Sequence, residues 1–336
     1  MSKPSVLIAG CVHFALKELE ALSKLHNVHH LPQVSRPEFF ELCKSKYQGV
    51  KTVYRESTSA KYIGSFDEEL IRHLPQRASV KFICSNAAGY DSIDINAAAQ
   101  RGIYVSNTPG AVDTATADIA MILLLNACRN ITQSEKNLKE GRWNAGIFMG
   151  TNPEGKKLGI LGMGGIGKAI AQRAYGFEMQ IQYHNRSRLP EEVEEKYHAT
   201  YVDFETLLKT SDIISVSVPL SKETTHLLAA REFAKCKDGV IIVNTARGKV
   251  IDEAALVKAL ESGKVSAVGL DVFEEEPKIH PGLLTHPRAT LLPHVGTNTL
   301  ETELMMEQLT LKNTEASLTT DKLLTPIPEH KQYFTS

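Results

Sequence analysis

Short apolar runs, each followed by a turn and then a segment of helix length, recur along most of the chain. Several runs are almost continuously apolar, such as Val240-Ile-Ile-Val243. Continuous hydrophobicity is typical of strands covered on both faces, as in a parallel sheet. The pattern predicts strands at Ser5–Ala9, Phe82–Ser85, Lys157–Leu161, Met179–His184, Ile213–Val218, Val240–Asn244, Val268–Asp271 and Thr290–Leu292. It predicts helices at Ala115–Cys128, Gly165–Tyr175, Asp203–Thr210 and Glu253–Ser262. The alternation indicates an α/β fold.

The pattern also indicates two domains. The chain has 336 residues, enough for two domains at about 150 residues each. Asn107-Thr-Pro-Gly110 interrupts the pattern before the long helix, and the predicted strands from 157 to 292 form one run. We expect the chain to leave its first domain near residue 110 and to return to it later. The prediction is therefore one domain of residues 1–110 plus about 305–336 and a second of 111–304. Both would be doubly wound parallel sheets, Rossmann-like or flavodoxin-like, with a cleft between them.

The strongest local motif is Gly162-x-Gly164-x-x-Gly167, which lies between a predicted strand and a predicted helix. In a dinucleotide site the first glycine permits a tight turn, the second lets the backbone approach a pyrophosphate, and the third allows close helix packing. Unpaired N–H groups at the start of the helix would then bind the pyrophosphate. The candidate cofactor-binding residues of this loop are Gly162, Gly164, Gly165, Ile166 and Gly167. The second domain is thus predicted to bind a dinucleotide.

The same residues also nearly match the phosphate-loop motif of a nucleoside triphosphatase, since Gly167 is followed by Lys168. That motif requires Ser or Thr at the next position to bind Mg²⁺. The residue there is Ala169, which favours the dinucleotide interpretation.

The segment after the second predicted strand of this domain bears on the choice of cofactor. NAD-preferring folds carry Asp or Glu about 20 residues after the glycine loop, to bind the ribose hydroxyls. Here the segment is Asn185-Arg186-Ser187-Arg188, with no acid. Two guanidinium groups, a hydroxyl and an amide would attract a 2′-phosphate through charge-assisted bonds. The sequence therefore predicts NADPH preference, with NADH as a weaker alternative; the competing interpretation is two solvated surface arginines.

Three further candidate residues follow predicted strands: Arg247, Glu276 and His294. Ligands of doubly wound sheets bind at the carboxyl ends of strands, so we expect these loops to converge. Any one of them taken alone would more often be a surface ion pair, an acidic turn or a structural histidine. Their combination beside a dinucleotide loop favours catalysis.

These motifs resemble the D-isomer-specific 2-hydroxyacid dehydrogenases over nearly the whole chain. The matching motifs are Gly162–Gly167, Asn244-Thr-Ala-Arg-Gly248, Asp271-Val-Phe-Glu-Glu-Glu-Pro277 and Pro293-His-Val-Gly296. Within the family the sequence is most similar to the glyoxylate/hydroxypyruvate reductase branch, particularly its fungal members. The segments 185–188 and 271–278 carry this narrower resemblance.

The resemblance implies a role for each residue. Arg247 would grip the substrate carboxylate and polarise its carbonyl, and His294 would be the general acid. Glu276 would orient the imidazole and favour its protonated form. Asp271 would bond the nicotinamide carboxamide, and Thr116 would approach the cofactor phosphates. The backbone N–H groups of Ala88 and Gly89, in a loop after a predicted strand, would hold the substrate carboxylate; the alternative is a simple turn.

Composition restricts the other function classes. The chain has 38 Lys+Arg and 39 Asp+Glu residues, so it lacks the basic excess expected for binding nucleic acid or an anionic membrane. Five scattered cysteines without a CxxC pair indicate reduced thiols, and the histidines show no metal-ligand spacing, so no metal is predicted. The N-terminus lacks the features of a signal peptide. We expect a cytoplasmic protein.

Taken together, the sequence predicts an NADPH-preferring reductase that converts small 2-oxo acids to (R)-2-hydroxy acids, and the resemblance implies a homodimer. Trp143, Ile147, Phe148 and Met149 would reach the pocket, reach a neighbouring subunit, or pack internally. Gly146, near a place where branch members often carry Trp, would leave room for bulkier acids such as ketoisocaproate or phenylpyruvate. The rivals are an NAD-linked D-lactate or D-3-phosphoglycerate dehydrogenase and a C-terminal-binding-protein-like corepressor that senses the dinucleotide.

Overall fold

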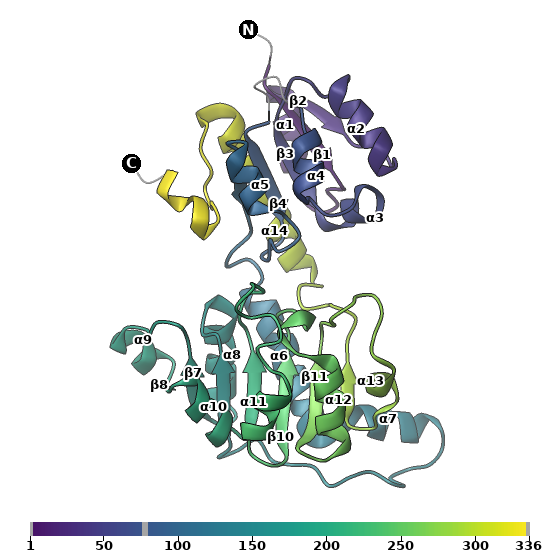
Figure 1. Cartoon of the computed structure of the whole chain (residues 1–336), viewed down its shortest axis with the longest axis vertical. Helices are drawn as coiled ribbons and strands as arrows, with labels where there is room; N and C mark the ends of the chain where they lie inside the picture. Colours follow the sequence, from purple (N-terminus) through teal and green to yellow (C-terminus); the bar gives the residue numbers. More distant parts are fainter. Residues whose placement is uncertain (1–2, 76–79, 334–336) are drawn as a thin grey trace. The chain divides into compact units, whose positions relative to one another are not determined.

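The computed structural model describes residues 3–75 and 80–333, and the chain divides into two compact units (Figure 1). One unit comprises Met1–Val112 and Asn298–Ser336, and the other comprises Asp113–Thr297. The sequence placed these boundaries at 110 and about 305. The structure places them beside the long helices instead: α6 (Asp113–Arg129) begins the second unit, and α14 (Leu300–Thr320) lies wholly in the first.

The first unit is built on a five-stranded parallel sheet in the order β2-β1-β3-β4-β5. This is the order of flavodoxin-like folds. Its strands are β1 (Ser5–Ala9), β2 (Asn27–His30), β3 (Val50–Glu56), β4 (Phe82–Asn86) and β5 (Tyr104–Ser106). Its helices are α1 (Leu16–Leu25), α2 (Arg36–Lys44), η1 (Ser57–Ser59), α3 (Ala60–Ile63), α4 (Glu68–His73), α5 (Ile95–Gln100), α14 and η3 (Pro328–Tyr333). One face packs on α1 and α14, and the other is covered by a core that includes Phe39, Ile71 and Ile103.

The second unit is built on a seven-stranded parallel sheet in the order β12-β11-β10-β9-β6-β7-β8. Numbered from β6, this is the 3-2-1-4-5-6 order of dinucleotide-binding folds with one strand added. Its strands are β6 (Lys157–Leu161), β7 (Gln180–His184), β8 (Ala199–Tyr201), β9 (Ile213–Val216), β10 (Val240–Asn244), β11 (Val265–Leu270) and β12 (Ala289–Leu291). Its helices are α6, α7 (Ile131–Lys139), α8 (Gly165–Tyr175), α9 (Glu191–Lys196), α10 (Phe204–Thr210), α11 (Ala230–Lys235), η2 (Gly248–Val250), α12 (Glu253–Glu261) and α13 (Pro281–Thr285).

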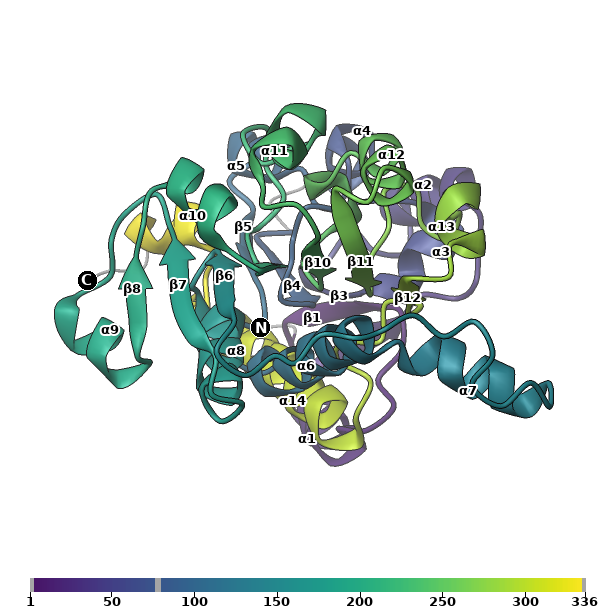
Figure 2. The same cartoon turned by 90° about the horizontal axis from the view of Figure 1, so that it is seen from below.

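Helices cover both faces of this sheet, as the continuously apolar strands predicted. Figure 2 shows α6 and α8 on one face and α10, α11 and α12 on the other. Strands β9 and β10 are buried along their whole length. The strand predicted at Ile213–Val218 ends two residues earlier, at Val216. The Ser217 N–H still bonds the Leu161 carbonyl, but residues 217–221 belong to neither strand nor turn.

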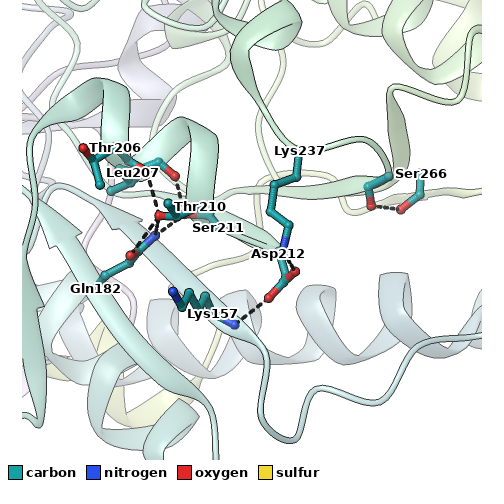
Figure 3. A network of polar contacts seen from close by, with 10 residues as sticks. Lys157, Gln182, Thr206, Leu207, Thr210, Ser211, Asp212, Lys237 and Ser266 are labelled. Atoms are coloured by element: carbon teal, nitrogen blue, oxygen red, sulfur yellow. Dashed lines mark hydrogen bonds and ion pairs between the residues drawn. The ribbon is translucent and has the colours of Figure 1, made fainter.

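A polar network closes the amino-terminal edge of the sheet (Figure 3). The buried Gln182 amide donates to Thr210 Oγ1 and Ser211 Oγ, both at 2.8 Å. Asp212 accepts the Lys157 backbone N–H at 2.8 Å and pairs with the Lys237 ammonium group. These contacts fix the amino-terminal edge of the sheet. The candidate residues lie at the opposite edge, at the carboxyl ends of the strands. None of the helices in the described part of the chain meets the length and hydropathy needed to traverse a bilayer.

Candidate functional site

The glycine loop joins β6 to α8 and leaves room for a ligand on one side. A Cβ atom on Gly162 would lie 2.8 Å from the Ser217 carbonyl, and one on Gly167 would lie 2.3 Å from the Gly162 oxygen. A Cβ on Gly164 would meet nothing within 4 Å. Gly162 and Gly167 are therefore required by packing, whereas Gly164 and Gly165 are exposed at the start of α8. This arrangement fits a pyrophosphate bound at a helix N-terminus.

In the segment after β7, some of the side chains predicted to bind a 2′-phosphate are bonded within the protein and others are exposed. Asn185 Oδ1 accepts the Met163 N–H at 2.7 Å, so this side chain ties the segment to the glycine loop. Arg188 forms a two-bond ion pair with Glu194, at 2.9 and 2.6 Å. Arg186 and Ser187 are exposed, and within the described residues Arg186 forms no ion pair. Arg186 is thus the guanidinium open to a phosphate in this conformation.

The Glu194 carboxylate that holds Arg188 is part of a small network. It also accepts the Tyr183 hydroxyl at 2.6 Å. The hydrogen bonds from Arg188 and Tyr183 lower the pKa of Glu194, so the carboxylate stays charged near neutrality. This network turns Arg188 toward α9.

The structure brings His294 and Glu276 into direct contact. His294 Nδ1 lies 2.9 Å from Glu276 Oε2, and the Phe273 N–H donates to the other carboxylate oxygen at 3.0 Å. The hydrogen bond to Glu276 raises the pKa of His294, against the opposing effect of burial. Burial pushes the pKa of Glu276 upward, but its hydrogen bonds to His294 and the Phe273 N–H leave it below the ordinary value. The pair favours an imidazolium beside a carboxylate.

Arg247 acts on the same two groups through its charge. The charge of its guanidinium opposes the rise in the pKa of His294 and contributes to the lowered pKa of Glu276. Arg247 follows β10, Glu276 follows β11 and His294 follows β12. The turn that carries Arg247 is shaped by Asn244, which donates to the Arg247 carbonyl at 2.9 Å and accepts the Ala246 N–H at 3.0 Å. The three predicted residues therefore share one end of the sheet.

Asp271 organises the turn that carries His294. Its two carboxylate oxygens accept the N–H groups of Val295 and Gly296 at 2.8 and 2.9 Å. Its carbonyl accepts the His294 N–H at 2.8 Å. His294 has a φ of 55°, a conformation unusual for a residue with a side chain, and these three bonds hold it there. A bond to the nicotinamide carboxamide, implied by the family resemblance, would use the remaining lone pairs of the same carboxylate.

Two other residues lie near these turns. Thr116, on α6, is buried beside Gly296: a Cβ there would lie 3.4 Å from its Cγ2. Asp113, at the start of α6, lies against Gly165: a Cβ there would be 2.0 Å from Asp113 Oδ2. Thr116 thus borders the His294 turn. The position of Asp113 was not predicted, because nothing in the local sequence relates this residue to the glycine loop.

Buried hydroxyl groups support a polar ligand at this edge. Three residues have buried hydroxyl oxygens that bond no partner among the described residues: Ser215 in β9, Ser217 just after β9, and Thr245 just after β10. Buried polar groups are usually hydrogen-bonded. A ligand with hydroxyl and amide groups, such as a dinucleotide, fits these positions. Residues 3–75 and 80–333 contain no cluster of three or more His, Cys, Asp or Glu side chains suited to a metal ion.

The loop predicted to hold a carboxylate follows β4 in the first unit. Within the described residues, the backbone N–H groups of Ala88 and Gly89 bond no partner, and both residues are half-buried. Adjacent unpaired N–H groups are able to bind an anion.

Comparison with known proteins decides the family. Residues 121–296 match the family "D-isomer specific 2-hydroxyacid dehydrogenase, NAD binding domain". The chain belongs to the D-isomer-specific 2-hydroxyacid dehydrogenases. It is 47% identical over 332 residues to 4-methyl-2-oxopentanoate reductase A of Aspergillus oryzae, covering 98% of this chain and 100% of that protein. Membership makes the chain an oxidoreductase of the glyoxylate reductase branch with a nicotinamide cofactor.

Solved structures of this dehydrogenase family agree with the fold. A glyoxylate reductase from Paecilomyes thermophila has a TM-score of 0.95 and 49% identity, covering 98% of this chain and all of that one (100%). An NADPH-dependent glyoxylate/hydroxypyruvate reductase from Sinorhizobium meliloti, in complex with NADP and malonate, has a TM-score of 0.84 and 31% identity. It covers 98% of both chains. The two parallel-sheet units are therefore those of the family.

Proposed function

We propose that this dehydrogenase reduces small 2-oxo acids to (R)-2-hydroxy acids, with NADPH preferred over NADH. The observation that carries the proposal is the hydrogen-bonded His294–Glu276 pair, which shares the carboxyl end of the sheet with Arg247. The relatives named for the reduction of glyoxylate and 4-methyl-2-oxopentanoate support the substrate class.

In this proposal a nicotinamide cofactor, when bound at the glycine loop, would supply the hydride for the carbonyl carbon of the substrate. Arg247 binds the substrate carboxylate and polarises the carbonyl, since a guanidinium keeps its charge at any physiological pH. His294, whose protonated form is favoured by its contact with Glu276, donates the proton to the carbonyl oxygen. In the oxidative direction His294 accepts the proton from the hydroxyl. The Ala88 and Gly89 N–H groups bind the substrate carboxylate as well.

Arg186 carries the proposed NADPH preference. Its guanidinium is exposed next to Ser187, and the segment holds no carboxylate that would repel a 2′-phosphate. Arg188 contributes less, because its guanidinium is already bonded to Glu194. The complex of the Sinorhizobium meliloti reductase with NADP is consistent with this assignment.

A homodimer is part of the proposal. Figure 1 shows α7 extending away from the sheet of the second unit. Large apolar side chains are exposed along α7 and the segment after it: Ile131, Leu138, Trp143, Phe148 and Met149. A second copy would bury this surface, because exposed apolar clusters of this kind mark interfaces. Light scattering after size exclusion would give the dimer mass; a monomer at micromolar concentration would contradict it.

A steady-state panel tests the reaction. Glyoxylate, hydroxypyruvate, ketoisocaproate and phenylpyruvate are each assayed with NADPH and with NADH. The expected result is turnover of at least one acid, with higher kcat/KM for NADPH. Turnover of the two bulky acids would indicate that Gly146 leaves room for them, and their rejection would limit the enzyme to the small acids. No turnover of any of the four would overturn the reductase assignment.

A further inference from the structure

Asn107 is bonded to the loop that carries Ala88 and Gly89. Its Nδ2 atom lies 2.6 Å from the Ala88 carbonyl oxygen. The next residue, Thr108, donates its backbone N–H to the Ala87 carbonyl at 3.0 Å. Two consecutive residues after β5 thus bond two consecutive carbonyls of the loop after β4. Neither bond was expected from the sequence, because the partners belong to different strands' loops.

These two bonds set the direction of the unpaired N–H groups. A trans peptide is planar, so its C=O and N–H bonds point in opposite directions. Because Asn107 holds the Ala88 carbonyl, the Gly89 N–H points to the other side of the loop. Because Thr108 holds the Ala87 carbonyl, the Ala88 N–H is directed in the same way. The Ala88 and Gly89 N–H groups, which are proposed to bind a carboxylate, are therefore oriented by hydrogen bonds to the carbonyl groups on the opposite side of the loop.

The rest of the loop and Asn107 itself are also fixed. Arg55, buried on β3, donates to Ser92 Oγ at 2.9 Å and to Ser85 Oγ at 3.4 Å, which ties the two ends of the loop together. The Thr325 hydroxyl donates to the Asn107 carbonyl at 2.6 Å, and the Asn107 N–H bonds the Thr325 carbonyl at 3.3 Å.

Thr325 is held in turn by α14. Asn313, which is fully buried, accepts the Thr325 N–H at 3.0 Å and donates to the Thr325 hydroxyl at 2.9 Å. A continuous set of hydrogen bonds therefore runs from α14 through Thr325 and Asn107 to the Ala88 carbonyl. Such pre-ordering lowers the entropy lost when a ligand binds.

We infer that Asn107 is a positioning residue for the substrate carboxylate, and that the segment following α14 acts through it. This inference rests on the proposed reductase function. Asn107 does not touch the substrate; its amide holds the Ala88–Gly89 peptide so that the N–H donor faces the carboxylate. Its loss should weaken binding of the 2-oxo acid and leave binding of the dinucleotide, which belongs to the second unit, unchanged.

Steady-state kinetics of four variants test the inference. Asn107→Ala removes the donor, and the nearly isosteric Asn107→Asp replaces it with a carboxylate that cannot donate. Thr325→Val removes the hydroxyl that holds the Asn107 carbonyl. Asn27→Ala is the matched control, because Asn27 Nδ2 also donates to a backbone carbonyl, that of Lys3 at 3.2 Å, but at the amino-terminal edge of the same sheet.

The expected result is a KM for the 2-oxo acid about tenfold higher or more in Asn107→Ala, as for loss of a hydrogen bond to a charged group. Asn107→Asp should raise it further, Thr325→Val should raise it less, and Asn27→Ala should leave it unchanged. The KM for NADPH should stay within about twofold of wild type in all four, since the lost interaction concerns one substrate only. Calorimetric titration with oxamate, a non-reducible 2-oxo acid analogue, in the presence of NADPH should show the same order of dissociation constants.

The outcomes separate the two claims. If the wild-type protein reduces none of the four 2-oxo acids, the proposed function fails. If the wild type is active but Asn107→Ala and Asn107→Asp keep its KM and its oxamate affinity, the positioning role fails and the proposed function stands. An equal rise in the KM for NADPH would also overturn the role, since it would report general damage. If neither variant at position 107 folds, Thr325→Val decides, and a wild-type KM in that variant overturns the inference.

Discussion

His294 Nδ1 lies 2.9 Å from Glu276 Oε2, and both residues are fixed by backbone bonds from the segment that begins at Asp271. The imidazole and the carboxylate are therefore oriented before any substrate arrives. The raised pKa of His294 and the lowered pKa of Glu276 have the same origin, which is their mutual hydrogen bond acting against burial.

Replacing the general acid should abolish most of the activity. His294→Ala is expected to lower kcat by about 100- to 10,000-fold, the usual contribution of general acid–base catalysis. Affinity for NADPH, measured by fluorescence titration, should change little. Near-wild-type kcat would mean that another group delivers the proton.

Replacing the partner of the histidine should shift the pH profile. The pKa of His294 is raised in the folded protein, so reduction should persist above the ordinary histidine value and be lost as the pH rises through the raised pKa. Glu276→Gln removes the charge that raises it, so the alkaline limb of kcat/KM should move to lower pH.

Glu274→Gln is the matched control for this shift. Glu274 lies in the same acidic run, but its carboxylate pairs with His226 at 2.6 Å rather than with His294. The alkaline limb of kcat/KM in Glu274→Gln should therefore match that of the wild type. An unmoved limb in Glu276→Gln would show that the carboxylate does not set the titration of His294.

The two arginines after β7 should behave differently. Arg186→Ser is expected to lower the ratio of kcat/KM for NADPH to that for NADH by about tenfold or more, as for loss of a charge-assisted bond. Arg188→Ser should change this ratio less and lower the Tm instead, because it removes a bonded partner of Glu194. If the two variants had equal ratios of kcat/KM for NADPH to kcat/KM for NADH, the larger role of Arg186 in cofactor choice would be contradicted.

Two glycines of the same loop should separate ligand binding from folding. In Gly164→Ala the new methyl group meets no protein atom within 4 Å, so the Tm should be preserved while the KM for NADPH rises. In Gly167→Ala the methyl group lies 2.3 Å from the Gly162 oxygen, so the Tm should fall. Unchanged NADPH binding in Gly164→Ala would show that the pyrophosphate does not bind against Gly164.

His26 should make the protein less stable in acid. Burial lowers its pKa, and its two ring nitrogens bond no partner among the described residues. The unfolded chain takes up the proton near about pH 6.5, so stability should fall as the pH drops below that value towards the lowered pKa. His26→Leu should show a smaller loss of Tm between neutral and mildly acidic buffer. His30→Leu, at an exposed position, should behave as the wild type.

The sequence predicted which candidate residues share one end of the sheet better than it predicted the contacts that hold them. Arg247, Glu276 and His294 follow buried strands, and strand ends of a parallel sheet meet at one edge, so their convergence follows from topology. The Asn107–Ala88 bond and the Arg188–Glu194 pair could not be predicted, because each depends on how loops of separate elements approach one another. A local pattern carries no information about such contacts.

Some strands were missed for a related reason. β2 is an edge strand of Asn, Val and two His residues with only partial burial, so it lacks the apolar run used for prediction. β3 is largely buried but contains Lys51, Thr52, Arg55 and Glu56. The side chains of Lys51, Thr52 and Arg55 bond partners far along the sequence. β5 and β8 have three residues each, too few to show a period.

A Cβ atom on Gly248 would lie 1.8 Å from the Phe273 carbonyl carbon, so the backbone after Arg247 is pressed against the backbone before Glu276. The backbone segments that carry the Arg247 guanidinium and the Glu276 carboxylate cannot move separately without breaking this backbone contact. Efforts to retune this enzyme for new acids by laboratory evolution should therefore keep both segments constant and diversify the neighbourhood of Gly146 instead.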